Sequence, residues 1–214
     1  MKNSLALYGA GGHARVVYDS IARTDGLSLE YCLSDSQTDI SNAFEHVVIE
    51  AAGKNRFKAL VNAGTAIHLA IGDLKARQKI FREYEDIINY WSSVIDPTAL
   101  ISARAHIGAG CYIGARAIIN LDTEIGENSI INTGVIVEHD NRIGSNVHLS
   151  PGTVTGGYVT IGQNSWIGIG ATIKDRVSIG ENSIIGAGSV IVKDIPSNVV
   201  AYGCPGTVKR ELPS

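Results

Sequence analysis

The 214-residue chain lacks several features that would assign it to a common class of protein. It has no excess of basic residues, since 18 Lys and Arg stand against 21 Asp and Glu. Proteins that bind nucleic acid or anionic membranes normally carry such an excess. No apolar run approaches the ~18 residues needed to span a bilayer, and the apolar stretch near Met1 is too short for a signal peptide. We therefore expect neither a nucleic acid nor a membrane among its partners.

Cysteine is also scarce. Cys32, Cys111 and Cys204 are far apart, and they form neither a Cys-x-x-Cys metal motif nor the even set of a disulfide framework. A reducing compartment is the simplest explanation, so the sequence predicts a cytoplasmic protein without a bound metal ion. With 44% hydrophobic residues the chain can bury a sizeable core, which excludes a disordered protein.

Aromatic residues are sparse in the second half of the chain, where a short repeat is present. Nine of the 13 aromatic residues precede residue 93. Beyond that point an aliphatic residue recurs at every sixth position from Ile95 to Ile191, and Thr155 is the exception. A small residue often precedes the aliphatic one by two positions, and glycine often follows it; we expect glycine or asparagine to take the turn conformation that side chains resist. This period predicts a solenoid of short strands with the aliphatic residues stacked inside.

The repeat resembles that of the hexapeptide acyltransferase superfamily. The resemblance implies a left-handed parallel β-helix with three strands, or 18 residues, in each coil. It also implies a homotrimer that binds acyl-CoA along the groove between adjacent helices. We therefore expect an α/β domain over residues 1–92, followed by a β-helix domain with a C-terminal cap over residues 93–214.

The first 92 residues predict a small Rossmann-like α/β domain. The expected strands are short apolar segments at residues 5–8, 31–34, 47–49, 59–62 and 67–71, and the expected helices span residues 15–22 and 74–86. The turn Gly9–Ala14 reads GAGGHA between the first strand and the first helix, and Asp35 follows the second strand. This pattern is typical of a phosphate-binding turn at a helix N-terminus. Because only half of a doubly wound sheet is present, a mononucleotide or nucleotide-sugar is favoured over NAD, and a plain tight turn stays open.

Two breaks in the repeat indicate candidate sites. Residues 132–148 read NTGVIVEHDNRIGSNVH, and Thr155-Gly156-Gly157 contains the non-aliphatic core position. In the first break His139 precedes Asp140, and a neutral imidazole takes up a proton near pH 7 while a carboxylate orients it. A turn residue on a solvated corner is the alternative for His139. His148 follows nine residues later, half a coil away, so the two histidines are expected to meet only across an interface between subunits.

A closer resemblance covers nearly the whole chain. The segments His139-Asp140, His148–Gly152 and Gly156-Gly157, with the GAGGHA turn and Gly203–Gly206, are similar to those of bacterial sugar acetyltransferases of the sialic acid O-acetyltransferase type. That group includes N-acetyltransferases for nucleotide-linked 4-amino-4,6-dideoxy sugars, such as the UDP-sugar enzyme of bacillosamine synthesis. The resemblance implies an acetyl-CoA-dependent N-acetyltransferase of bacterial glycan biosynthesis, with UDP as the expected nucleotide and GDP or dTDP as alternatives.

The resemblance also implies roles for individual residues. His139 is expected to be the general base, and Asp140 its carboxylate partner. Residues expected to contact the nucleotide-sugar are Gly11, Gly12, His13, Asp35 and Asn132. Residues expected to contact acetyl-CoA are His148, Gly157, Ile169 and Ala187. Since acetyl-CoA is an activated thioester, a base and oxyanion donors suffice for direct transfer, and no covalent nucleophile is required.

Other chemistries remain as alternatives. An acyl-enzyme on cysteine is disfavoured because Cys111 occupies a core position and Cys204 has no evident base. A sialic acid O-acetyltransferase would use the same base on a hydroxyl acceptor, without a nucleotide. A zinc lyase of the γ-carbonic anhydrase type shares the β-helix but needs closely spaced histidines, and the repeat region offers only His106, His139 and His148. A non-catalytic scaffold would not need the His139-Asp140 departure.

Overall fold

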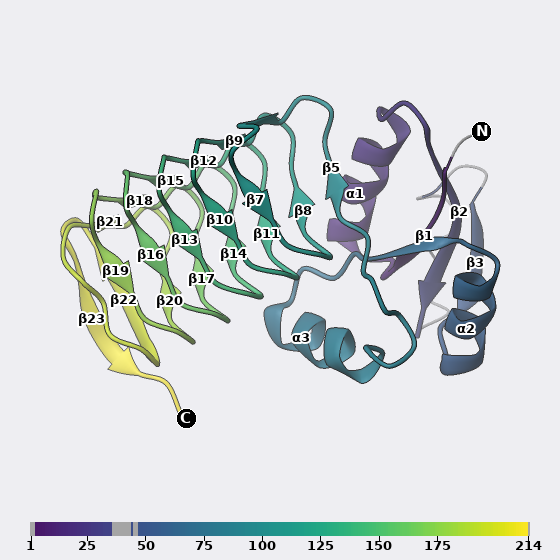
Figure 1. Cartoon of the computed structure of the whole chain (residues 1–214). Coiled ribbons are helices and arrows are strands. Elements are labelled where there is room, and N and C mark those ends of the chain that lie inside the picture. The colour runs from purple at the N-terminus through teal and green to yellow at the C-terminus, as the bar shows by residue number, and fades with distance from the viewer. Residues whose placement is uncertain (1–2, 36–43, 45–46, 214) are drawn as a thin grey trace. The chain divides into compact units, whose positions relative to one another are not determined.

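The computed structural model describes residues 3–35, 44 and 47–213 of the chain (Figure 1). The chain forms two compact units, Met1–Pro97 and Thr98–Ser214. In the described part of the chain, no helix combines the length and the apolar character that crossing a bilayer requires.

The first unit contains a parallel four-stranded sheet in the order β3-β2-β1-β4. Its strands are β1 (Asn3–Tyr8), β2 (Leu27–Ser34), β3 (Val48–Ala51) and β4 (Ala66–Leu69). Its helices are α1 (Gly12–Ala22), α2 (Lys54–Asn62) and α3 (Leu74–Glu83), and the short β5 (Val94–Ile95) follows near the end of the unit. The chain runs outward from β1 to β2 and β3 and then returns to β4 on the other side of β1. This reversal of direction is where open α/β sheets bind ligands, at the carboxyl ends of the strands.

The alternation of side chains along β1 sets the packing of this sheet. Ala6 and Tyr8 belong to a buried cluster with Phe57 and Leu60 of α2, so they point to the face that α2 covers. Leu5 and Leu7 are equally buried and, being the alternate residues, point to the opposite face. The helix α1 lies against that face and buries Ala14, Val17 and Ile21.

One expected strand of this unit is wrong. Residues 59–62 form the last turns of α2, and Phe57 and Leu60 are its buried residues. Their spacing of three places both on one side of a helix, and a short apolar run does not by itself distinguish a helix from a strand. The other expected strands and helices are present with shifted ends; for example, α1 begins at Gly12, because the carbonyl of Gly11 already accepts a hydrogen bond from Arg15.

The second unit is the expected left-handed parallel β-helix, whose coils follow one another in Figure 1. Three sheets form its sides, and we name each after one strand. The β13 sheet contains β7 (His106–Ile107), β10 (Glu124–Ile125), β13 (Arg142–Ile143), β16 (Thr160–Ile161) and β19 (Ser178–Ile179). The β12 sheet contains β6 (Leu100–Ile101), β9 (Ile118–Ile119), β12 (Ile136–Val137), β15 (Val154–Thr155), β18 (Thr172–Ile173) and β21 (Val190–Ile191). The β14 sheet contains β8 (Tyr112–Ile113), β11 (Ile130–Ile131), β14 (His148–Leu149), β17 (Trp166–Ile167), β20 (Ile184–Ile185), β22 (Val199–Gly203) and β23 (Gly206–Glu211).

The hexapeptide period determines this core. In each two-residue strand the second residue points inward, so Ile125, Ile143 and Ile161 stack on residues 18 positions away in neighbouring coils. Each fully buried isoleucine contributes roughly 1.5–3 kcal/mol relative to an exposed one. Stacking therefore supplies a continuous core that no single coil has alone.

The expected reason for the repeated glycine is wrong in part. Gly126, which follows Ile125, has no positive φ. A Cβ added at Gly126 would lie 2.5 Å from the backbone nitrogen of Ser145 in the next coil, so the close approach of the coils requires glycine there. The left-handed turn conformation occurs two residues later, where Asn128 has a φ of 56°.

Candidate active site

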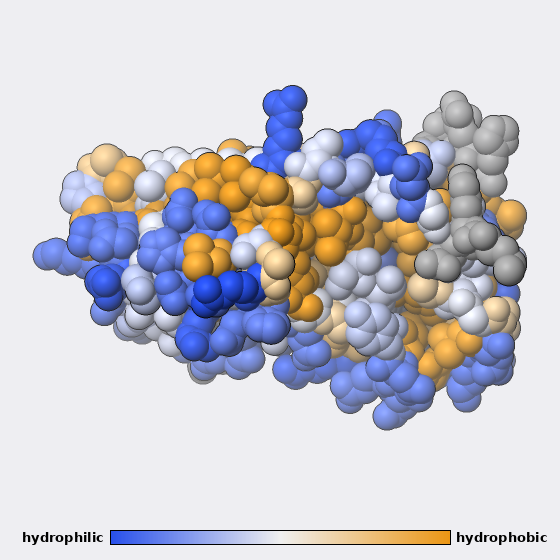
Figure 2. Space-filling view, turned by 45° about the horizontal axis from the view of Figure 1, so that its top comes forward, coloured by the Kyte–Doolittle hydropathy of each residue, from blue (hydrophilic) through white to orange (hydrophobic). Residues whose placement is uncertain are grey.

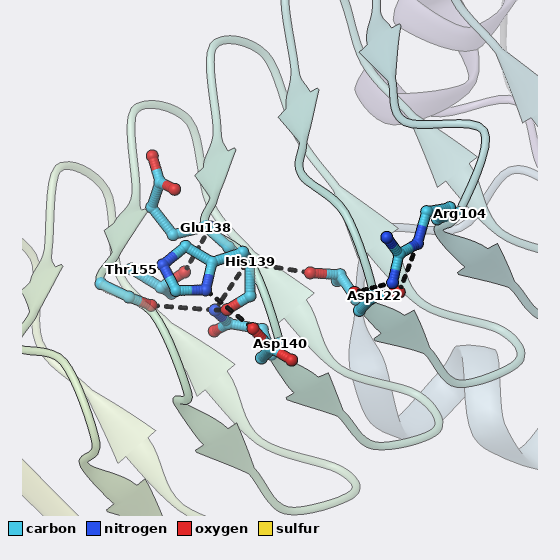
Figure 3. Close-up of polar contacts among 9 residues, drawn as sticks. Arg104, Asp122, Glu138, His139, Asp140 and Thr155 are labelled. Carbon is cyan, nitrogen blue, oxygen red and sulfur yellow. Dashed lines mark hydrogen bonds and ion pairs between the residues drawn. The ribbon is translucent and has the colours of Figure 1, made fainter.

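The turn between β12 and β13 carries the expected base and its carboxylate. Nδ1 of His139 lies 2.8 Å from Oδ2 of Asp140 (Figure 3). When the Nδ1–H group donates to that carboxylate, the lone pair of the neutral imidazole is on Nε2. The two side chains are 42% and 36% exposed, so a ligand can reach them. The pair therefore presents a basic nitrogen at the surface of the β-helix.

Gly157 lies beside this imidazole, in the next coil. A Cβ at Gly157 would be 2.7 Å from Cε1 and 2.8 Å from Nε2 of His139. A side chain at this position would therefore displace the basic nitrogen. The carbonyl of His139 accepts a hydrogen bond of 3.1 Å from the backbone N–H of Tyr158. The structure thus brings two predicted site residues, His139 and Gly157, into contact.

The two breaks in the repeat meet at this corner. Thr155 points into the core and is fully buried, and its hydroxyl oxygen accepts a hydrogen bond of 3.3 Å from the backbone N–H of Glu138 (Figure 3). An aliphatic residue at position 155 would leave that N–H without this acceptor. The irregular core position therefore supports the turn that carries His139.

Asn141 holds the same turn from inside, and sequence reasoning gave it no role. Its side chain is fully buried, and Nδ2 donates to the carbonyls of Glu138 at 2.7 Å, His139 at 3.2 Å and Gly156 at 2.8 Å. Elsewhere in the repeat this position holds Ala, Cys, Ser, Thr or Val. A larger amide at a position of small residues was the signal that could have revealed it.

An ion pair lies one coil before the candidate base. Arg104 donates to both carboxylate oxygens of Asp122, from Nε at 2.9 Å and from Nη2 at 2.5 Å (Figure 3). Asp122 occupies the corner position 18 residues before Asp140. The pair is exposed, so we attribute little stability to it. Arg104 offsets the negative charge of Asp122, which would otherwise add to that of Asp140 in the neighbouring coil.

Asn132 and His148 form a second group on another side of the coil. Nδ2 of Asn132 lies 3.3 Å from Nε2 of His148, and the His148 ring stacks on Trp166 with a centroid distance of 5.3 Å. His148 belongs to the β14 sheet, whereas His139 follows the β12 sheet. The two histidines therefore occupy different parts of one coil, as their spacing indicated. A meeting across subunits stays a prediction.

Ile169 and Ala187 lie 18 residues apart on neighbouring coils, further along the corner that carries Asn132. Both are exposed, and Ile169 is 62% exposed despite its apolar side chain. In the described chain no hydrogen bond uses the backbone N–H of Gly157, Ile169 or Ala187 as a donor. The same holds for the equivalent Ala115 in an earlier coil, so this free donor is a property of the corners and does not single out these three residues.

The first unit contains a pocket of about 440 Å³ at the carboxyl ends of β1, β2 and β4. All four residues predicted there line it, namely Gly11, Gly12, His13 and Asp35. A Cβ at Gly11 or Gly12 would meet no atom within 4 Å, and neither residue has a positive φ. The fold itself therefore does not require these glycines, and the open space beside the N-terminus of α1 suits a bound phosphate.

Tyr8 and Asp35 form one wall of this pocket. The Tyr8 hydroxyl donates a hydrogen bond of 2.7 Å to Oδ2 of Asp35. Burial, together with the hydrogen bond and charge of Asp35, raises the pKa of Tyr8, so its hydroxyl stays protonated and keeps donating. One oxygen of the carboxylate is thereby held in place, which orients Asp35 at the pocket rim.

A buried arginine supports the other wall. Arg77 of α3 is fully buried, and its Nη1 donates to the carbonyl of Leu69 and, at 3.3 Å, to that of Ile71. Ala70, Ile71 and Gly72 line the pocket after β4. Arg77 thus fixes the backbone of this wall. The pattern around Arg77 is that of an ordinary amphipathic helix, so this contact could not be predicted from it.

The other side chains considered for chemistry are placed as follows. Cys111 is fully buried in the β-helix core, and burial raises the pKa of the Cys32 thiol to about 11, so neither is placed as a nucleophile. Cys204 is exposed. Within the ranges that the structure describes, no group of three or more His, Cys, Asp or Glu side chains is arranged to hold a metal ion.

Comparisons with known families agree with the two units. The model of the PglD N-terminal domain matches residues 4–84. Two hexapeptide models match the β-helix: the hexapeptide repeat of succinyl-transferase over residues 104–139, and the bacterial transferase hexapeptide with six repeats over residues 158–193. A search of curated proteins found no match.

Solved structures resemble the whole chain. A mutant of perosamine N-acetyltransferase from Caulobacter crescentus, in complex with CoA and GDP-perosamine, is 33% identical with a TM-score of 0.89, and the match covers 98% of each chain. The acetyltransferase domain of PglB from Neisseria gonorrhoeae, in complex with acetyl coenzyme A, is 30% identical with a TM-score of 0.89, and the match covers 98% of this chain and 100% of that one. WeeI from Acinetobacter baumannii, 23% identical with a TM-score of 0.81 over 97% of this chain and 100% of that one, shows the same fold.

Proposed function

This chain belongs to the family of bacterial hexapeptide-repeat sugar acetyltransferases, and on that premise we propose that it acetylates the 4-amino group of a nucleotide-linked 4-amino-4,6-dideoxy sugar for bacterial glycan biosynthesis. The acetyl donor is acetyl-CoA. One observation carries the proposal: a single chain combines an exposed His139–Asp140 pair with an open pocket at the GAGGHA turn. The first feature suits transfer to an amine, and the second suits an acceptor that carries a diphosphate.

The pocket of the first unit supports a nucleotide-linked acceptor. Backbone N–H groups at the N-terminus of α1 and the two glycines Gly11 and Gly12 suit close approach of phosphate oxygens. Asp35 at the rim offers a carboxylate oxygen to a ribose or base donor. We expect UDP as the nucleotide, with GDP as the second candidate, since the Caulobacter relative binds GDP-perosamine.

The proposed transfer is direct. Nε2 of His139 accepts a proton from the sugar amine while the amine nitrogen attacks the thioester carbonyl carbon. Asp140 stabilises the imidazolium that results. The backbone N–H of Gly157 is our candidate donor to the carbonyl oxygen as negative charge develops on it. His139 then gives the proton to the CoA sulfur as the carbon–sulfur bond breaks, which leaves an amide and CoA and returns the base to its neutral form.

We further propose that three copies of the chain assemble through an apolar face of the β-helix. Outward-facing residues of the β12 sheet include Leu100, which is 67% exposed, and the partly exposed Ile118, Ile136 and Val154. Figure 2 shows hydrophobic residues gathered along the solenoid on the side that it displays. A homotrimer would cover this face and bring His148 of one subunit toward His139 of the next. The polar outward residues of the β13 sheet, such as Glu124 and Arg142, form a less suitable interface.

The test is CoA release from acetyl-CoA with a panel of acceptors. The panel contains UDP-, GDP- and dTDP-linked 4-amino-4,6-dideoxy sugars and free sialic acid. We expect turnover with one nucleotide-linked amine, its loss in His139→Ala, and its retention in His106→Ala, whose histidine lies exposed on the β13 sheet. Turnover with sialic acid alone would replace the proposal by O-acetylation. An active His139→Ala variant would remove His139 as the base.

A further inference from the structure

We propose that Tyr158 is a positioning residue that holds the His139 imidazole in its working orientation, and that Arg176 in turn holds Tyr158. The inference rests on the proposed function, in which His139 is the base. Neither residue has a role among the predictions made from the sequence.

The backbone of Tyr158 is the first observation. Tyr158 has a φ of 61° at a corner position, in line with Asp122, Asp140 and Arg176 in the neighbouring coils. In the described chain every other non-glycine residue with a positive φ is Asn, Asp or Arg. A bulky aromatic residue is a true outlier in this region, and such outliers concentrate at functional sites. The turn alone is better served by asparagine, so the reason for tyrosine lies in what its ring contacts.

The ring contacts are the second observation. The rings of Tyr158 and His139 meet edge to face, with centroids 5.3 Å apart and planes at 90°. The guanidinium carbon of Arg176 lies 4.4 Å from the centroid of the Tyr158 ring. Tyr158 is 47% exposed, so it does not fill the core. Its ring is fixed between a cation and the imidazole, at the surface where a substrate would arrive.

These contacts complete the restraint of the imidazole. The hydrogen bond to Asp140 restrains the imidazole at Nδ1 only, so the ring can still tilt. A Cβ at Gly157 would lie 2.7 Å from Cε1 and 2.8 Å from Nε2, so glycine leaves room for the imidazole on that side. Contact with the Tyr158 ring limits this tilt of the imidazole, so Nε2 of His139 keeps one direction. Since a base acts only within hydrogen-bond reach of its proton, this restraint should influence the rate of transfer and not the binding of either substrate.

The test compares Tyr158→Asn, Tyr158→Phe and the parent with the acceptor that the panel identifies. Asparagine suits the left-handed turn, so Tyr158→Asn should unfold at the parental temperature or above it. Its kcat should nevertheless fall by about 10- to 100-fold, with both KM values within about twofold of the parent. Tyr158→Phe keeps the ring and should retain kcat. Parental kcat in Tyr158→Asn, an effect on KM alone, or an equal loss in Tyr158→Phe would overturn the proposal.

Arg176→Asn tests the second link. Asparagine again suits the turn, and we expect a loss of a few-fold in kcat that does not add to the loss in Tyr158→Asn. Full additivity of the two losses would contradict the coupling. His139→Ala distinguishes failure of the proposed base from failure of the positioning role. If His139→Ala is active, the proposed base is wrong, whereas an inactive His139→Ala beside a fully active Tyr158→Asn overturns the role of Tyr158 alone.

A measurement without turnover gives the same answer. In protein labelled with ¹³C at histidine Cε1, the His139 signal is identified by its loss in His139→Ala. We expect this signal to shift in Tyr158→Asn, because the ring current of Tyr158 is removed, and to stay in place in Tyr158→Phe. An unchanged signal in Tyr158→Asn would show that the two rings are not in contact and would overturn the proposal.

Discussion

Two corners of the same β-helix use the left-handed backbone conformation in different ways. At one corner asparagines recur, and each donates through Nδ2 to Oδ1 of the next, at 3.0 Å from Asn128 to Asn146 and from Asn146 to Asn164, and onward to Asn182 and Asn198. We call this set the asparagine corner. At the His139 corner the same conformation is held by Asp122, Asp140, Tyr158 and Arg176, which differ in charge and size.

The difference separates a corner that stabilises the fold from one that we expect to carry the chemistry. The asparagine corner is uniform, and its side chains satisfy one another, so it stabilises the stack of coils. The His139 corner is varied and its side chains are more exposed; two of them, Asp140 and Tyr158, contact the His139 imidazole. We therefore take the corner with equal backbone geometry and unequal side chains as the candidate site. Variants that exchange or remove these side chains test the contrast.

Asp140→Asn should give the largest effect on activity. It places at the His139 corner the residue type of the asparagine corner, so the turn, whose φ is 58° at Asp140, should be kept. The amide cannot stabilise an imidazolium as a carboxylate does, and we expect kcat to fall by about 10³-fold. Steady-state CoA release measures the loss, and circular dichroism checks the fold. A variant with parental kcat would remove Asp140 from the mechanism.

Gly157→Ala should lower kcat by about 100-fold, because the new methyl group would displace the imidazole and its Nε2. The fold should tolerate the change, since Ala103, Ala109 and Ala115 occupy the same position of the repeat. The readouts are kcat and the unfolding temperature of the same preparation. Retained kcat would show that His139 does not act from the position found here.

Asn141→Ser should lower kcat by about tenfold. Ser165 occupies the same repeat position and donates to the carbonyl of Gly180 at 3.0 Å, so serine is expected to keep the bond between coils. It would lose the bonds to the carbonyls of Glu138 and His139, which hold the turn, at a cost of about 1 kcal/mol in the free energy of unfolding. Ser165→Ala is the matched control and should change stability only. Equal kcat losses in both variants would contradict a specific role for Asn141.

Asn146→Ala should leave kcat unchanged and reduce the free energy of unfolding by about 1–3 kcal/mol. It removes the acceptor of Asn128 and the donor to Asn164 in the asparagine corner. Chemical denaturation measures the loss, and CoA release serves as the control. A loss of kcat without a loss of stability would show that this corner also contributes to chemistry.

Much of the fold could be predicted because it repeats. The period of six determines which residues point inward, and the core from Ile107 to Ile191 follows it. Residues 59–62 were misassigned because four apolar-rich residues without a clear period fit both a strand and a helix. The reason for the glycine after each aliphatic residue was also misjudged, because the approach of a neighbouring coil is a contact over 18 residues that a local pattern does not reveal.

The candidate site was predictable where a residue departs from the repeat. His139 and Asp140 were singled out in this way. Thr155 was singled out too, but the reason for its hydroxyl in the core became clear only from its hydrogen bond with the backbone N–H of Glu138. Tyr158 was not singled out, because the sequence of one coil does not reveal that its φ is positive. Arg77 was not singled out either, because its partners are backbone carbonyls. Side chains whose chemical type breaks the repeat were singled out, whereas Tyr158 and Arg77, whose importance we infer from their contacts, were not.

The most direct test of the contrast is to measure kcat and the unfolding temperature together on Asp140→Asn and Asn146→Ala. We expect Asp140→Asn to unfold at the parental temperature with kcat reduced by about 10³-fold, and Asn146→Ala to unfold at a lower temperature with parental kcat. Parental kcat in Asp140→Asn, or loss of kcat in Asn146→Ala at the parental unfolding temperature, would contradict this contrast.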